Sequence, residues 1–208
     1  KKLKQKLTIS CNQNTSNATF QNGELTFNNN HMLCVNIEMN ENDFQTMRNE
    51  SRFGPDINDN NGNAACAVLV QYANDCDVPF PNEYNWYSGN IEIDGNLVQN
   101  AGIRKKGFLG SIFSPAPSLK IETERYVQNS SFNLSKNITL NNNSQNETRI
   151  WTSLALKIYE LANYPAPLCN LANVTVNSEP FGVYTHIETM DEKFLLREFG
   201  NSNGHLYE

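Results

Sequence analysis

The chain has none of the features that mark a membrane-spanning or nucleic-acid-binding protein. No run of about 18 apolar residues occurs in it, so we expect no membrane span. Positive charge is not in excess, because 16 Lys and Arg stand against 22 Asp and Glu for a net charge of −6. Nucleic acid is therefore not an expected partner. The one basic cluster, Lys1, Lys2, Lys4 and Lys6, is the remnant of a trimmed signal peptide, a juxtamembrane remnant or a solvated terminus. Because no apolar run follows it, the solvated terminus is favoured.

Several common catalytic and metal-binding patterns are also missing. There is no Cys-x-x-Cys, no His-Glu-x-x-His and no Walker loop, which argues against a zinc ribbon, a zincin and a P-loop enzyme. We therefore predict no metal ligand in the chain. The five cysteines fit disulfides of a secreted protein better, and Cys66 with Cys76 would close the shortest loop.

Asparagine is what the chain has in abundance. There are 34 Asn residues, and nine of them begin an Asn-x-Ser/Thr sequon, where roughly four would be expected by chance. The sequons begin at Asn14, Asn17, Asn49, Asn129, Asn133, Asn137, Asn142, Asn146 and Asn173. This excess suggests a glycoprotein that is secreted or displayed on a cell surface.

The hydrophobic pattern predicts an α+β fold with a mixed or antiparallel sheet and a few helices. Residues 1–30 read as a loosely ordered polar lead-in, and residues 31–208 as one domain. Strands are predicted at 32–37, 91–93, 97–104, 117–121, 132–140, 174–176 and 183–187, with tight turns at Asp94-Gly95 and Asn177-Ser178. Helices are predicted after Asn42, over 64–72, from a capping box of Ser144 and Glu147, and from a second one of Thr189 and Glu192 up to Gly200.

One group of charges could carry chemistry. Arg104, Lys105 and Lys106 lie between two glycines, and Lys120 projects from the polar face of a later strand. Phosphoryl transfer needs such cations to neutralise phosphate oxygens, together with an acidic partner such as Glu188 or Glu122. From the residues alone, a set of solvated surface charges explains this pattern as well.

Six elements in order resemble the spore-coat CotH kinase family of atypical, secretory-type protein kinases. They are Arg104-Lys105-Lys106-Gly107; Pro117-Ser118-Leu119-Lys120; Leu140-Asn141-Asn142-Asn143; Pro165-Ala166-Pro167; Asn177-Ser178-Glu179 with the strand to Glu188; and Gly204-His205-Leu206-Tyr207.

The resemblance implies a kinase-like lobe that uses ATP with Mg²⁺ or Mn²⁺ to phosphorylate Ser or Thr of coat, surface or secreted proteins. Carried over by position, Lys120 is the nucleotide-phosphate lysine, Arg104 and Lys106 support the phosphates, and Glu188 is an acidic catalytic residue.

The chain departs from the family pattern in ways that bear on activity. Asn146 stands near the place of an aspartate and Trp151 near that of an arginine. The family's metal-binding and catalytic aspartates do not occur before Glu208, so we expect an incomplete domain or an inactive member. The alternative is a non-catalytic adhesin or structural binding module on the same scaffold. Because the asparagine loop lies near the family's cleft, we expect the Asn142 and Asn146 sequons to stay unused.

Overall fold

The computed structural model describes residues 20–21, 24–25, 27–28, 30–51, 83–107, 114–127, 136–204 and 206. In chain order the elements are β1 (Phe20–Gln21), β2 (Glu24–Leu25), β3 (Leu33–Met39), α2 (Glu41–Asn49), β4 (Tyr87–Ile93), β5 (Asn96–Lys106), β6 (Ser118–Glu122), β7 (Asn137–Asn141), α4 (Trp151–Leu161), β8 (Cys169–Val176), β9 (Glu179–Ile187) and α5 (Glu192–Phe199). The helix predicted at 64–72 and most of the lead-in lie outside the described residues.

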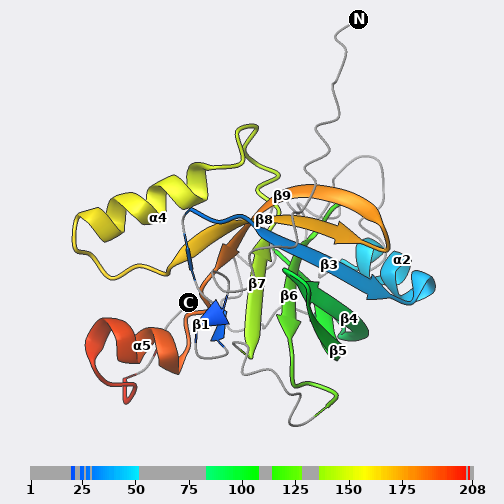
Figure 1. The fold of residues 1–208 in the computed structure, drawn as a ribbon, viewed down its shortest axis with the longest axis horizontal. Coiled ribbons are helices and arrows are strands. Elements are labelled where there is room, and N and C mark those ends of the chain that lie inside the picture. Colours follow the sequence, from blue (N-terminus) through cyan, green and yellow to red (C-terminus); the bar gives the residue numbers. More distant parts are fainter. Residues whose placement is uncertain are drawn as a thin grey trace, which may run out of the picture.

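Seven strands close into a barrel in the order β3-β4-β5-β6-β7-β9-β8 (Figure 1). Neighbouring strands are antiparallel, except that β3 runs parallel to β8 and pairs Leu33 with Ala172. The predicted α+β fold with a mixed sheet is confirmed. Closure into a barrel was not predicted, because the pairing of β3 with β8 joins distant segments whose alternation does not specify a partner. The kinase-like lobe stays a prediction.

Period-two alternation fills the barrel with aliphatic side chains. Leu119 and Ile121 of β6 face the interior, and Lys120 and Glu122 take the outer face, as predicted. Phe44 and Met47 of α2 are buried and join this core. The N-cap of α2 is Asn40 and not the predicted Asn42, because the Asn40 side chain accepts hydrogen bonds from the first-turn amides.

Both predicted two-residue turns are confirmed. Asp94 and Gly95 have φ angles of 47° and 81°, and Asn177 and Ser178 have φ angles of 49° and 65°. Positive φ at both positions gives a turn whose twist matches the strands it connects. Asp94 also anchors its hairpin, because its Oδ1 accepts from the Cys34 amide at 2.8 Å.

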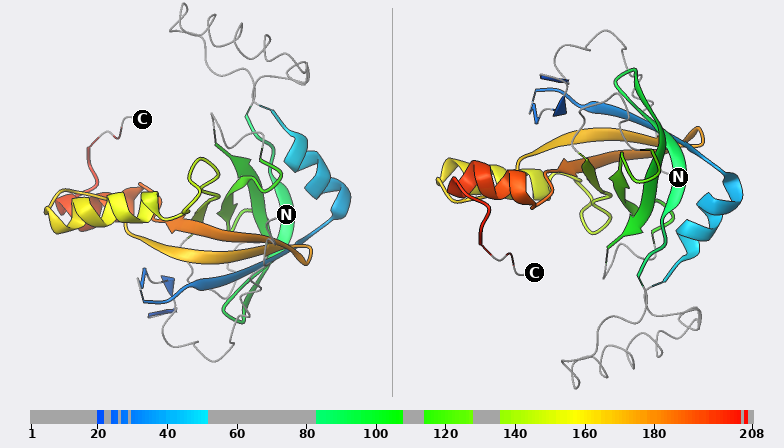
Figure 2. Two further views of the ribbon diagram at one scale, coloured as in Figure 1. Left: turned by 90° about the horizontal axis from the view of Figure 1, so that it is seen from above. Right: turned by 90° about the horizontal axis from the view of Figure 1, so that it is seen from below.

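α4 and α5 project together from the side of the barrel opposite α2 (Figure 2). The predicted Ser144 and Glu147 capping box of α4 is wrong: both residues lie in turns, and the helix begins after Ile150 without a side-chain cap. α5 is capped by Asp191 and not by Thr189, and it ends as predicted at Gly200, whose φ is 72°. None of the helices in the described ranges is long and apolar enough to cross a membrane.

Of the five cysteines, the structure describes Cys34 and Cys169. Cys11, Cys66 and Cys76 lie outside the described residues. Cys169 at the start of β8 is a buried free thiol. The pairing of the cysteines, including Cys66 with Cys76, therefore stays a prediction.

Candidate phosphate-binding face

The strand register brings the predicted cations onto one outer face of the barrel. Arg104 of β5 lies directly opposite Lys120 of β6, and Lys120 lies opposite Thr139 of β7. We call these three residues the cationic row. Lys106, two positions beyond Arg104, pairs with Ser118 and is a diagonal neighbour of Lys120. All three predicted phosphate-binding residues are thus adjacent across two strands.

Like charges that face each other across two strands destabilise a sheet. Lys120 is half-buried, and its side chain makes no hydrogen bond or ion pair with any other residue in the described ranges. An anion that bound between Arg104 and Lys120 would remove their repulsion. The row therefore favours a phosphate-sized anion on electrostatic grounds.

An aromatic ring positions the outer end of the row. The Arg104 guanidinium lies 4.6 Å from the centroid of the Trp86 ring, and the Arg125 guanidinium lies 4.3 Å from it. Gly102 makes room for this arrangement, because a Cβ there would come within 2.5 Å of the Arg125 Cδ. The absence of a side chain at Gly102, the first of the two glycines that flank Arg104 to Lys106, thus has a steric reason.

Lys105 does not belong to the site, although it lies between two of its residues. Its side chain is 1% exposed and points into the barrel, where Nζ donates to the carbonyl oxygens of Arg48 and Glu50 at 2.9 and 2.8 Å. Burial lowers the pKa of Lys105. Its function in the fold is to satisfy carbonyl groups at the C-terminal end of α2.

The asparagine loop after β7 is a hydrogen-bonded scaffold beside the row. Asn142 is 2% exposed, and its Nδ2 donates to the Ala116 carbonyl at 2.8 Å. Asn143 has a φ of 51°, and its Nδ2 donates to Thr185 Oγ1 of β9 at 2.8 Å. Short amide side chains suit this loop, because they tolerate positive φ and bond to nearby backbone.

Glu188 occupies a different environment from the one predicted. It follows β9 directly, and its Oε2 accepts from the Leu168 amide at 2.9 Å. Arg197 of α5 binds the same carboxylate, with Nε 3.1 Å from Oε1. Among the described residues, the charge partner of Glu188 is thus Arg197 and not Lys120.

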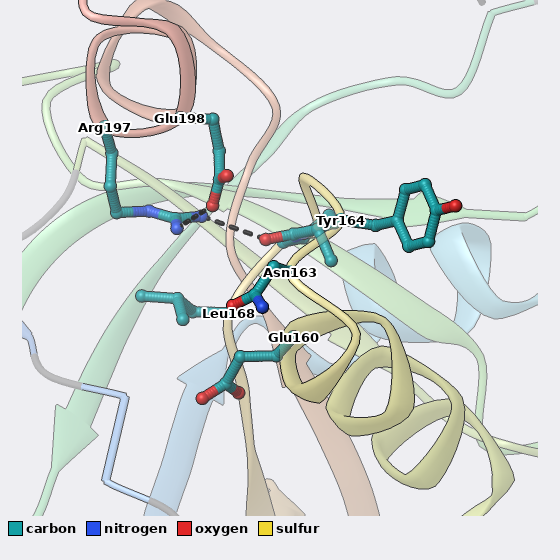
Figure 3. Close-up of a pocket in the computed structure, with 8 residues that line it drawn as sticks. Glu160, Asn163, Tyr164, Leu168, Arg197 and Glu198 are labelled. Carbon is teal, nitrogen blue, oxygen red and sulfur yellow. Dashed lines mark hydrogen bonds and ion pairs between the residues drawn. The ribbon is translucent and has the colours of Figure 1, made fainter.

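A pocket of about 250 Å³ lies next to this ion pair, between the end of α4 and α5. In Figure 3 the Arg197 and Glu198 side chains extend from α5 toward the loop that follows α4. The residues that line the pocket are Glu160, Asn163, Tyr164, Ala166, Pro167, Leu168, Arg197 and Glu198. None of them belongs to the cationic row, so the pocket and the predicted phosphate site are separate.

Sequence reasoning missed the hydroxyl group of Thr139 in the row. Thr139 is the neighbour of Lys120, and its Oγ1 lies 3.4 Å from Thr189 Oγ1. Threonine on the outer face of a strand is too common to single out from the sequence. Only the register shows that Thr139 continues the line of Arg104 and Lys120.

The described residues do not fit a metal ion. No group of three or more His, Cys, Asp or Glu lies close enough together in the described ranges to hold one. The face can neutralise an anion with cations and hydrogen-bond it with hydroxyls.

Comparison with known proteins agrees with the order of these elements. The family model described as CotH kinase protein matches residues 103–208, which is more than half of the chain and includes Arg104, Lys106, Lys120 and Glu188. No protein with a curated description matches the chain. On the family match, this chain belongs to the CotH kinase protein family.

Proposed function

We propose that this chain supplies the nucleotide-binding side of a kinase that transfers phosphate from ATP to Ser or Thr of coat, surface or secreted proteins. The observation that carries the proposal is the cationic row, where Arg104 and Lys120 face each other and Lys106 lies diagonal to Lys120. The family match supports the kinase-like part of it. The location, secreted or at a cell surface, is part of the proposal.

In this proposal the row binds the phosphate groups of ATP. Lys120 and Arg104 neutralise their oxygens, Lys106 adds charge, and the Thr139 hydroxyl donates a hydrogen bond. In the transfer, a substrate hydroxyl oxygen bonds to the γ-phosphorus, the bond from that phosphorus to the bridging oxygen breaks, and ADP leaves with its electron pair. The hydroxyl proton passes to a base or to water.

Glu188 is the acidic catalytic residue of this scheme, the role that the family resemblance implies for it. It lies one residue beyond Ile187, which pairs with Thr139 in the neighbouring strand. Arg197 binds its carboxylate. Mg²⁺ or Mn²⁺ would accompany the nucleotide, and the described residues form no metal site for it.

The test compares ATP binding by the wild type, by Lys120→Ala and by a control variant, Lys136→Ala. Lys136 is a matched control, because its side chain is 72% exposed and pairs with Glu124, outside the row. We expect Lys120→Ala to raise the Kd for ATP by at least about tenfold, the effect of losing one charged contact of about 1.4 kcal/mol. We expect Lys136→Ala to change it less than about twofold. Equal affinities for all three proteins would refute the site.

A non-catalytic binding module is the second candidate, and one observation favours it. The Glu188 carboxylate is taken up by Arg197 and by the Leu168 amide, so it is not presented to a reacting group. Radiolabelled ATP with a mixture of candidate substrate proteins separates the two functions. Transfer of radioactive phosphate to a substrate protein that is lost in Lys120→Ala supports the kinase. Binding of ATP with no transfer of phosphate to protein supports the binding module.

A further inference from the structure

The cationic row continues past Arg104 to an aromatic side chain at the start of the next strand. Tyr87 of β4 pairs with Ile103 of β5, so Trp86, one residue earlier, stands beside Arg104. The 4.6 Å between the Arg104 guanidinium and the centroid of the Trp86 ring agrees with this placement. The row thus extends from Thr139 on β7 to Trp86 at β4, across strands that lie side by side in Figure 1.

Three planar side chains gather at the Trp86 end of the row. The segment after β6 folds back across Gly102, where a Cβ would come within 2.5 Å of Arg125 Cδ. This path brings the Arg125 guanidinium to 4.3 Å from the centroid of the Trp86 ring. The Tyr126 hydroxyl donates to the Trp86 carbonyl oxygen at 3.2 Å. We call Trp86, Arg125 and Tyr126 the platform.

The platform is held in place and still open to solvent. The Arg125 side chain is 36% exposed, and its Nη1 lies 2.9 Å from the Glu122 carboxylate. Tyr126 is 48% exposed. Because these contacts hold the planar groups before a ligand arrives, binding costs little conformational entropy. Exposed aromatic rings and guanidinium planes are the groups on which nucleobases stack.

Arg104 links the platform to the phosphate site. In the part of the chain that the structure describes, its guanidinium contacts the Trp86 ring and makes no hydrogen bond or ion pair. A guanidinium that stacks by its face keeps its N–H edge for phosphate oxygens. Lys120 lies directly opposite on the other side of Arg104. A flat ring followed by a chain of phosphates, as in a nucleoside triphosphate, matches this order of groups.

The two ends of the row give the ligand a direction. At the far end, Thr139 pairs with Ile187, and the acidic residue Glu188 follows directly. The acidic catalytic residue of the proposed function belongs where the terminal phosphate is transferred. Neighbouring strands lie about 4.8 Å apart, so Trp86 and Thr139 are separated by roughly 14 Å. This length suits an extended nucleotide whose base lies at the Trp86 end.

We propose that the platform is the nucleoside subsite of this chain. The base of ATP stacks on Tyr126 and Arg125 beside Trp86, and the phosphates follow the cationic row with the γ-phosphate at Thr139. This inference rests on the proposed function, because the phosphates must occupy the row. It adds where the base binds and in which direction the nucleotide lies.

The test measures the Kd of ATP and of inorganic tripolyphosphate, each with Mg²⁺, by isothermal titration calorimetry. Tyr126→Leu should raise the Kd for ATP by about tenfold, the effect of losing one stacked base, and change the Kd for tripolyphosphate by less than about twofold. Tyr126→Phe keeps the ring and should restore the affinity for ATP. The matched control is Tyr159→Leu on α4, because Tyr159 has a similar exposure of 54% and lies outside the platform. This control should change neither Kd.

Thr139→Val tests the direction of the nucleotide. It replaces a hydroxyl with a methyl group of similar size and should raise the Kd for ATP by about tenfold. The Kd for ADP should change by less than about twofold, because only the γ-phosphate reaches Thr139. NMR contacts between the Tyr126 ring protons and the carbon-bound protons of adenine provide a readout that does not depend on affinity.

The outcomes separate this proposal from the proposed function. If Lys120→Ala weakens binding of both ligands and Tyr126→Leu weakens neither, the row binds phosphate and the nucleoside subsite is overturned. Equal effects of Thr139→Val on ATP and ADP overturn the direction. A wild type that binds neither ligand, or a Lys120→Ala variant with both Kd values unchanged, overturns the proposed function and this inference together.

Discussion

His186 should make this fold sensitive to mild acid. Its ring is 2% exposed at the end of the barrel interior, and it stacks on Phe27 with the ring centroids 4.6 Å apart. Its Nδ1 lies 2.8 Å from Asn170 Oδ1, and because that oxygen only accepts, Nδ1 is the donor of the neutral ring. Burial lowers the pKa of His186 from 6.5 to about 3.

The sign of the effect follows from the two pKa values. In the unfolded chain His186 takes up a proton near pH 6.5, whereas in the folded chain it stays neutral until about pH 3. The stability contributed by the neutral ring is therefore complete above pH 6.5 and is lost as the pH falls through this window. The loss amounts to about 2 kcal/mol between pH 7 and pH 5, and it approaches roughly 5 kcal/mol near pH 3.

The assay is urea denaturation of the wild type and of His186→Gln at pH 7 and pH 5. Glutamine does not titrate, and its amide can still donate to Asn170. We expect the wild type to lose about 2 kcal/mol more than the variant between the two pH values. The other histidines are present in both proteins, so their contributions cancel. Equal losses would refute the reasoning.

NMR of the wild type keeps the prediction testable if His186→Gln does not fold. The imidazole C–H shifts of His186 should stay constant from pH 7.5 to pH 5, because the folded ring remains neutral in this range. A titration of that ring with a midpoint near pH 6.5 would contradict its burial.

Three further outcomes are expected. Lys105→Met should lower the free energy of unfolding by about 2–4 kcal/mol, because the carbonyl oxygens of Arg48 and Glu50 lose a charged donor. The control Lys136→Met, measured in the same urea assay, should lower it by less than about 0.5 kcal/mol. Equal losses would contradict the role of Lys105 as a buried donor. Ser178→Gly should raise the stability by about 0.5–1 kcal/mol, because Ser178 has a φ of 65°; a lower melting temperature would argue against this turn. Peptide mapping of protein from a glycosylating host should find Asn142 unmodified, because its Nδ2 is buried in a hydrogen bond; a glycan there would show that the loop is open.

The phosphate-binding face could be predicted from the sequence only in part. Alternation in β6 places Lys120 on the polar side of its strand, and the structure agrees. That Arg104 lies opposite Lys120 depends on the register of β5 with β6, which the strand sequences do not contain. The Glu188 contact with Arg197 depends on α5 folding back toward the start of β8, so the acidic residue and its partner could not be matched from spacing.

Local patterns determined those features of this chain that arise from neighbouring residues: the Asp94-Gly95 and Asn177-Ser178 turns, the end of α5 at Gly200, and the inward face of each strand. These are consequences of backbone sterics and side-chain alternation, which act over a few residues. Only the tertiary structure decided that β3 pairs with β8 to close the barrel, that Lys105 serves α2, and that the apolar stripe of α4 points away from its own barrel. Such contacts join distant segments, and their free energy depends on packing that exists only once the barrel has formed.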